Sequence, residues 1–126
     1  MKILNIEQFQ HIADCPLGNK TGEIELFRIV LRNSMSESFI PHAIKMPKLK
    51  GECKAWGLSL YKSEKRAIQA LKNLSKKKAG DGIAVANISD SHGIKYQTGD
   101  DLTHFTFYPF ENFVFLTEFK IIDHEE

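Results

Sequence analysis

Two groups of residues in this 126-residue chain carry side chains suited to binding or catalysis. Arg28 interrupts an otherwise apolar row, which makes it an unusual charge within a predicted strand. Further along, His104, Thr106 and Tyr108 alternate with phenylalanines, so we expect the three polar side chains to share one face of a strand. Polar groups set among apolar ones are typical of the floor of a ligand pocket. The alternative interpretation of His104 is a structural histidine, hydrogen-bonded at a sheet edge.

Two carboxylates near the aromatic end of the chain are candidates for a general base. Glu111 follows Pro109 in a predicted turn, and we expect it at the mouth of a pocket. Glu118 is predicted to point away from the neighbouring phenylalanines, toward solvent. A general base must lie within hydrogen-bonding reach of the proton it removes, and the sequence identifies no partner for either carboxylate.

The two cysteines, Cys15 and Cys53, are too few for a disulfide scaffold and fit no metal-binding spacing. Cys53 is a candidate nucleophile with His42, His92 or His104 as its base. Because no recognised nucleophile motif surrounds Cys53, a thiol without a catalytic role is the favoured interpretation. The five histidines show no paired spacing, so we predict no metal site.

Charge is divided unevenly along the chain. The net charge is +1, but residues 45–78 carry +9 and the remainder carries −8. Lysines on the outer face of the helix predicted within this segment are typical of a nucleic-acid interface. A solvated helix face is the plainer alternative, since only three arginines occur in the chain. A basic cleft would indicate a small anionic ligand, whereas an open basic face would indicate nucleic acid or an acidic protein partner.

Hydrophobic spacing predicts the elements that must position these residues. We expect a short helix over 5–13, a strand covered on both faces over 23–32, and a brief strand over 57–61. A longer helix begins at Ser63, which can cap it, and ends before Gly80. Residues 33–57 have no such pattern and are expected to form a long loop, of the kind that is a binding loop, a lid or a mobile, partly ordered segment.

After this helix the spacing of apolar residues changes to that of strands. Segments 82–88 and 93–97 are predicted to form a hairpin, followed by strands over 103–108 and 113–122. No repeat or linker is present, so we predict a single α+β domain over 1–126, with a twisted, mainly antiparallel sheet and two helices. The aromatic final strand is a candidate dimer edge, and the oligomeric state stays open.

Composition excludes several classes of protein. With 42% apolar residues the chain is neither disordered nor collagen-like. The longest apolar run, residues 113–116, is too short to span a bilayer. No pattern of a secretory signal peptide is present at the N-terminus. We therefore expect a cytoplasmic protein with no membrane partner.

The order of Arg28 on a first strand, then 57–61 leading into a helix, then a late strand after Glu111 resembles the ADP-ribosyltransferase fold. That resemblance implies a nucleotide-binding domain with NAD as its cofactor. Arg28 would contact a phosphate, Ser59 and Tyr61 would line the nicotinamide end, and Glu111 and His104 would be catalytic.

The chain departs from this family at Phe113, where the family has a second glutamate. The departure is compatible with a domain that binds a nucleotide without transferring ADP-ribose, or with one repurposed for protein binding. Over most of 24–122 the chain is also similar to small uncharacterised bacterial proteins. The shared segments are 53–59, of the form Cys-x-Ala-x-Gly-x-Ser, and 104–111, which holds His-x-Thr, Pro and Glu. This second likeness implies no activity.

Overall fold

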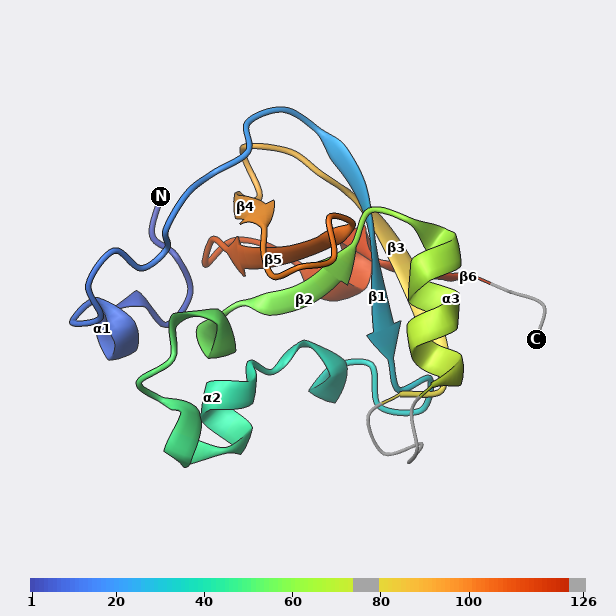
Figure 1. The fold of residues 1–126 in the computed structure, drawn as a ribbon, viewed down its shortest axis with the longest axis horizontal. Coiled ribbons are helices and arrows are strands. Elements are labelled where there is room, and N and C mark those ends of the chain that lie inside the picture. Colours follow the sequence, from blue (N-terminus) through green and yellow to red (C-terminus); the bar gives the residue numbers. More distant parts are fainter. Residues whose placement is uncertain (74–79, 123–126) are drawn as a thin grey trace.

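The computed structural model describes residues 1–73 and 80–122, and within them six strands form one antiparallel sheet in the order β4-β5-β2-β1-β3-β6 (Figure 1). The strands are β1 (Ile24–Val30), β2 (Leu58–Tyr61), β3 (Gly82–Ile88), β4 (Gly93–Gln97), β5 (His104–Pro109) and β6 (Lys120–Ile122). The α-helices are α1 (Ile6–Phe9), α2 (His42–Lys45), α3 (Glu64–Lys72) and α4 (Phe115–Glu118). Three 3₁₀ segments are η1 (Glu37–Phe39), η2 (Pro47–Leu49) and η3 (Cys53–Trp56). The predicted α+β domain with a twisted antiparallel sheet is confirmed.

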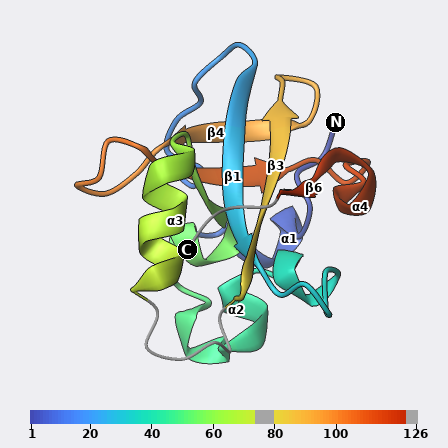
Figure 2. The same cartoon turned by 90° about the vertical axis from the view of Figure 1, so that its right-hand side faces the viewer.

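The sheet is strongly twisted, and each of its faces has its own core. Figure 2 shows β1 and β3 running steeply across β4 and β5. One face buries a row of leucine, valine and phenylalanine side chains from the central strands against Phe113 and Phe119. On the other face, α3 lays Ala67 and Leu71 over Phe27. Because β1 is apolar on both sides, it sits between these layers, as its sequence predicts.

Helix α3 begins where the sequence predicts. The hydroxyl of Ser63 accepts a hydrogen bond from the backbone N–H of Arg66, which satisfies a donor at the helix start. The helix extends to Lys72, and the predicted continuation through Lys76, Lys77 and Lys78 lies outside the described residues.

The predicted hairpin of 82–88 with 93–97 is wrong, although both strands exist. β3 pairs with β1 over its whole length, from Ile24↔Ile88 to Val30↔Gly82, and with β6 on its other side. β4 pairs with β5 instead. Five of the seven residues of β3 are buried. This burial fits a strand that is paired along both edges, by β1 and β6, and covered on both faces by packed layers.

The predicted strand over 113–122 is also wrong, because its first half folds into α4 and only Lys120–Ile122 is a strand. Phe115 and Phe119 are four residues apart, so one helical turn places both on the same side. There both rings pack on Phe39, with centroid distances of 4.8 and 5.0 Å. In β6, Ile121 is 41% exposed, so the end of the predicted strand is not a core strand.

Segment 33–57 is not an irregular loop. It holds η1, α2, η2 and η3, which lie together below β2 in Figure 1. Phe39, Ala43 and Trp56 bury their side chains, and the Trp56 indole N–H donates to the carbonyl of Lys50. The segment is thus a packed part of the domain. Phe39 belongs to the core that holds Phe113 and Phe119, whereas Ala43, Ala55 and Trp56 belong to a further core with Phe9 and Tyr108.

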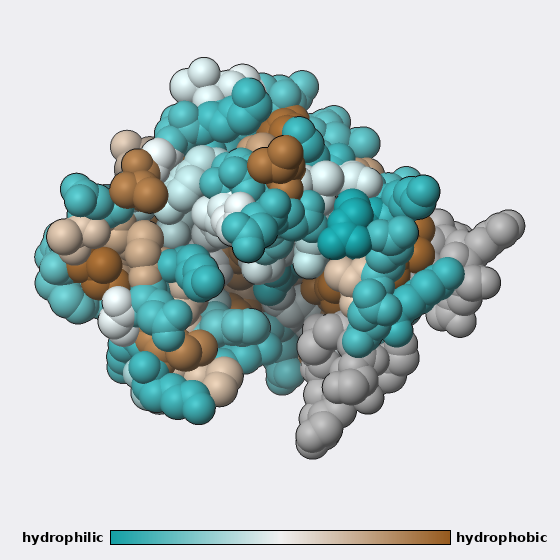
Figure 3. All heavy atoms as spheres, viewed as in Figure 1, coloured by the Kyte–Doolittle hydropathy of each residue, from teal (hydrophilic) through white to brown (hydrophobic). Residues whose placement is uncertain are grey.

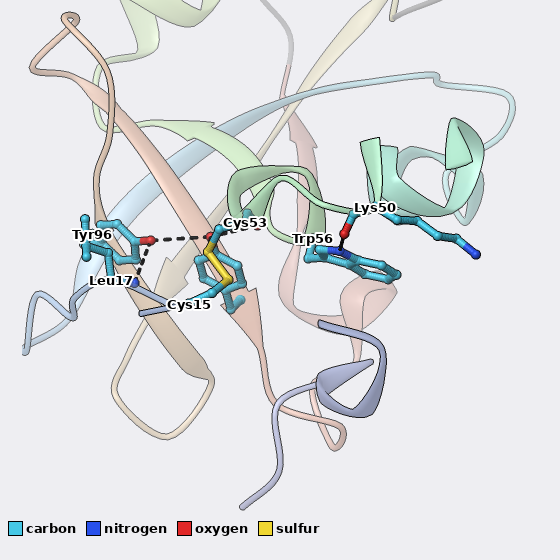
Figure 4. The surroundings of a disulfide bond; sticks show 7 residues. Cys15, Leu17, Lys50, Cys53, Trp56 and Tyr96 are labelled. Atoms are coloured by element: carbon cyan, nitrogen blue, oxygen red, sulfur yellow. Dashed lines mark hydrogen bonds between the residues drawn. A yellow bond between two sulfur atoms is a disulfide. The ribbon is translucent and has the colours of Figure 1, made fainter. Parts of the chain in front are cut away.

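Cys15 and Cys53 form a disulfide that joins the segment after α1 to η3 (Figure 4). The prediction that Cys53 is a thiol is therefore wrong. The disulfide also excludes the less favoured alternative, a nucleophilic Cys53, because its sulfur is bonded to Cys15. The Tyr108 hydroxyl donates to the carbonyl of Cys53 and contacts its sulfur, both at 3.2 Å. Disulfides are typical of oxidising compartments, and the cytoplasmic location stays a prediction.

The backbone edge of β4 is occupied by the segment that follows Cys15. The N–H of Lys20 donates to the carbonyl of Lys95 at 2.6 Å, and the N–H of Lys95 donates to the Asn19 side chain.

In the parts of the chain that the structure describes, no helix has the length and apolarity needed to cross a membrane.

We predict that replacing both cysteines, in a C15S/C53S variant, lowers the free energy of unfolding by about 2–4 kcal/mol, because the bond closes a long loop. The two cysteines are 38 residues apart. Urea denaturation of the variant and of the wild type, with and without dithiothreitol, measures the change. The reductant should shift the wild type to the stability of the variant and leave the variant unaffected; equal stabilities throughout would contradict the prediction.

Candidate functional site

The candidate site lies where β1 and β2 separate. These strands are paired only at Phe27↔Tyr61, and beyond this point the Arg28 side chain occupies the gap. Its Nε donates to the carbonyl of Ser38 and its Nη1 donates to the carbonyl of Ser59, both at 2.8 Å. Arg28 therefore satisfies the Ser59 carbonyl, which a continued ladder with β1 would have paired, and also the Ser38 carbonyl of η1.

Arg28 brings a positive charge into this gap that no carboxylate neutralises within the described residues. The ion pairs among the described residues involve Lys2, Arg66, His92 and Lys95, and none of them involves Arg28. The guanidinium lies 5.8 Å from the Phe39 ring centroid, and burial lowers the pKa of Arg28 to about 10. The group is still charged at neutral pH, so it makes the surrounding cavities electropositive.

Three neighbouring cavities surround this position, and His42 lines all of them. The smallest, of about 50 Å³, lies against Arg28, Lys54 and Ser59. A second, of about 310 Å³, extends from it along Ser59, His104 and Thr106. The third, also about 310 Å³, extends past Arg28 to Lys45. Together they offer room for a small ligand.

The charges around these cavities are mostly positive. Arg28, Lys45 and Lys54 contribute cations, and Glu52 is the carboxylate that lines the second cavity. Burial lowers the pKa of His42, and the charges of Arg28 and Lys45 lower it further. His42 is therefore neutral at pH 7 and would gain a proton more readily if an anion were bound beside it.

Ser59 and His104 form a hydrogen-bonded pair on neighbouring strands. The register Ser59↔Thr106 and Tyr61↔His104 makes the two residues diagonal neighbours on one face of the sheet. The His104 Nε2 lies 3.0 Å from the Ser59 hydroxyl. The exposed Ser59 side chain lines the cavity, so the pair faces the space that a ligand would occupy.

The other ring nitrogen of His104 is held by Thr98. Nδ1 lies 2.8 Å from the Thr98 hydroxyl and 3.3 Å from its carbonyl. The Thr98 hydroxyl can donate or accept, but its carbonyl can only accept, so the contact with the carbonyl favours the tautomer with the proton on Nδ1. In that tautomer Nε2 accepts from Ser59. Burial lowers the pKa of His104, which favours this neutral form of the imidazole.

Three of the other sequence-predicted site residues lie near His104. Ser59 is hydrogen-bonded to it, and the Tyr61 ring meets the His104 ring edge-on at a centroid distance of 5.4 Å. Arg28 reaches the group through the carbonyl of Ser59 rather than its hydroxyl. The structure therefore brings Arg28, Ser59, Tyr61 and His104 together.

Glu111 does not join this group. It follows the opposite end of β5 from His104, and its N–H donates to the carbonyl of Lys2. The chain turns after Pro109 and bridges Ile3 to Phe110, which holds Glu111 beside the N-terminal segment. The expected placement of Glu111 at the mouth of this pocket is therefore wrong. Glu118 is half-buried, with a carboxylate oxygen 3.4 Å from His92 Nε2, rather than simply facing solvent.

Sequence reasoning did not assign a role in this site to His42, Lys54 or Thr98. His42 and Lys54 lie in the segment predicted to be a binding loop, which was the available signal. Thr98 lies between the predicted strands 93–97 and 103–108, and its contact with His104 arises because β4 and β5 pair on either side of this connection. Within residues 1–73 and 80–122, no three histidine, cysteine or acidic side chains gather as a metal-binding group.

We predict that Arg28→Met lowers the free energy of unfolding by about 2–4 kcal/mol, because the carbonyls of Ser38 and Ser59 lose a charged donor. Arg32→Met is the matched control: Arg32 is exposed, and its change should stay within about 0.5 kcal/mol. Urea denaturation measures both. Equal stabilities of the two variants would show that Arg28 does not hold the strands.

No family model, curated protein or solved structure matches this chain.

Proposed function

We propose that the cavities around Arg28, His42 and Lys54 bind a small anionic ligand of the phosphate-bearing class, such as a nucleotide. The observation that carries this proposal is the charge of Arg28, which no carboxylate offsets among the described residues. Its Nη2 takes no part in the hydrogen bonds found among those residues, and in this proposal it donates to the ligand. A guanidinium is well suited to phosphate oxygens because its donors match their geometry.

The arrangement of the cavities supports a nucleotide within this class. A phosphate at Arg28 would have Lys54 on one side and Lys45 on the other, since these lysines line adjoining cavities. The uncharged part would extend along Ser59 and His104 toward Thr106. NAD is a candidate, and it would need to occupy both larger cavities. The position of Glu111 gives no support to ADP-ribosyl transfer, so the proposal is binding.

The surface in the view of Figure 3 is compatible with a polar ligand. Hydrophobic residues appear there as separate brown patches among hydrophilic ones, rather than as one continuous apolar surface. Large contiguous apolar patches are typical of protein or membrane partners. The visible surface therefore gives no preference to an apolar partner.

A basic face that binds nucleic acid or an acidic protein has less support. Lys45 and Lys54 line the cavities, whereas Lys65 and Lys72 are exposed beside a separate open hollow along α3. These four lysines thus contribute to different surfaces instead of lining one. A site with basic walls favours a small ligand over a macromolecule.

We predict that Lys54→Gln weakens binding of ADP or NAD about tenfold, equivalent to about 1.4 kcal/mol, because one cation is lost from the cavity wall. Lys120→Gln, an exposed change on β6, should bind like the wild type. Isothermal titration calorimetry measures both affinities. A double K65E/K72E variant should also keep its affinity; if it loses affinity while K54Q keeps it, the α3 surface is the site.

We predict that anion affinity rises as the pH falls from about 7.5 to 5.5, because a bound anion favours the protonated form of His42. The pKa of His42 in the free protein is below its usual value. Sulfate is the probe, since its charge is constant over this range. His42→Gln should remove much of the dependence, which separates His42 from His104 in the same cavity; an unchanged pH profile would contradict the prediction.

A further inference from the structure

We propose that Ser59 is a nucleophile activated by His104, and that the site hydrolyses small carboxylic esters. We expect the preferred esters to carry an anionic group, and this part of the inference rests on the proposed function. The inference itself rests on the hydrogen-bond chain from Ser59 through His104 to Thr98.

The geometry of this chain is that of a nucleophile, its base and an orienting group. Ser59 Oγ and His104 Nε2 are 3.0 Å apart, within the range in which a base can take the hydroxyl proton. The contact with the Thr98 carbonyl favours the tautomer with the proton on Nδ1, in which Nε2 presents its lone pair to Ser59. Thr98 therefore has the orienting role that a carboxylate has in the serine–histidine–aspartate triad.

The wider hydrogen-bond network fixes the Thr98 side chain in place. The Thr98 hydroxyl lies 2.8 Å from the Thr106 hydroxyl, which is almost fully buried. The backbone N–H of Thr98 donates to the carbonyl of His104, closing the turn between β4 and β5. The imidazole is thus held by both a side chain and the backbone of Thr98.

Charged groups near His104 suit the reaction at two stages. The ammonium of Lys54 is close enough to lower the pKa of His104, and it can stabilise negative charge that develops on a substrate carbonyl oxygen. Asp101 acts in the opposite sense, raising the pKa of His104, and favours the imidazolium formed when Ser59 gives up its proton. The imidazole of His104 is therefore neutral before the reaction, and the negative charge of Asp101 partly compensates the imidazolium that forms during it.

The reaction proceeds in two balanced steps. In the first, Ser59 Oγ bonds to the ester carbonyl carbon while its proton moves to His104 Nε2. The carbon–oxygen bond to the alcohol then breaks, and His104 returns the proton to the departing alcohol oxygen. In the second, His104 removes a proton from a water molecule while the water oxygen attacks the acyl carbon. The acyl–Oγ bond breaks, Ser59 regains a proton from His104, and a carboxylic acid leaves.

The first experiment uses phenylmethylsulfonyl fluoride on the intact, oxidised protein, followed by mass spectrometry and peptide mapping. We expect one sulfonyl group on Ser59, with fluoride released and the hydroxyl proton passing to His104. Ser59→Ala should lose the label and His104→Gln should slow labelling on the order of a hundredfold or more. Ser36→Ala, an exposed serine whose side chain caps nothing, should label like the wild type.

The second experiment compares hydrolysis of 4-nitrophenyl acetate with that of mono-4-nitrophenyl succinate, which carries a carboxylate. We expect the hydrolysis of both esters to depend on Ser59 and the succinate ester to have the lower KM. The rate should fall only at a pH below the usual pKa of histidine, because burial lowers the pKa of His104. No label on Ser59, or equal labelling of the wild type and His104→Gln, would overturn the proposal that Ser59 is an activated nucleophile. Labelling of Ser59 with no preference for the succinate ester would support that proposal and would contradict only the proposed binding of an anionic group.

Discussion

The arrangement of this domain depends on one side chain placed between two strands. Arg28 holds β1, β2 and η1 together through the carbonyls of Ser59 and Ser38. Because it takes the place of the ladder at Ser59, the sheet opens there without leaving that carbonyl unpaired. The same opening gives rise to the cavities and places a cation in their wall. The guanidinium of Arg28 therefore has two roles, because it joins these backbone segments and also supplies a positive charge for the candidate binding site.

The second constraint is the way segment 33–57 closes over the sheet. Its short helices contribute His42 and Lys54 to the cavities, while Phe39 and Trp56 anchor it in separate cores. The disulfide fixes the end of this segment at Cys53, directly before Lys54. The cavity wall is thus held by aromatic packing on one side and by a covalent bond on the other.

Local features of the sequence predicted much of the fold, and contacts between distant residues account for most of what they missed. The period of α3 and its Ser63 cap are local, as is the strand alternation that put His104 and Thr106 on one face. The pairing of Cys15 with Cys53 depends on tertiary structure, so composition gave no sign of it. Glu111 was misplaced because the N-terminal segment pairs beside it. The spacing of Phe115 and Phe119 fits either a strand or a helical turn, and packing on Phe39 decides between them.

The occupied edge of β4 has a consequence for how copies of this chain can meet. Sheets extend from molecule to molecule when an edge strand offers unpaired N–H and C=O groups, which is a route to fibrils. At β4 those groups of Lys95 are bonded to Asn19 and Lys20 of the same chain. The fully buried Lys95 side chain also donates to the Lys20 carbonyl. A neighbouring molecule therefore cannot add a strand at this edge unless it first displaces the chain's own N-terminal segment.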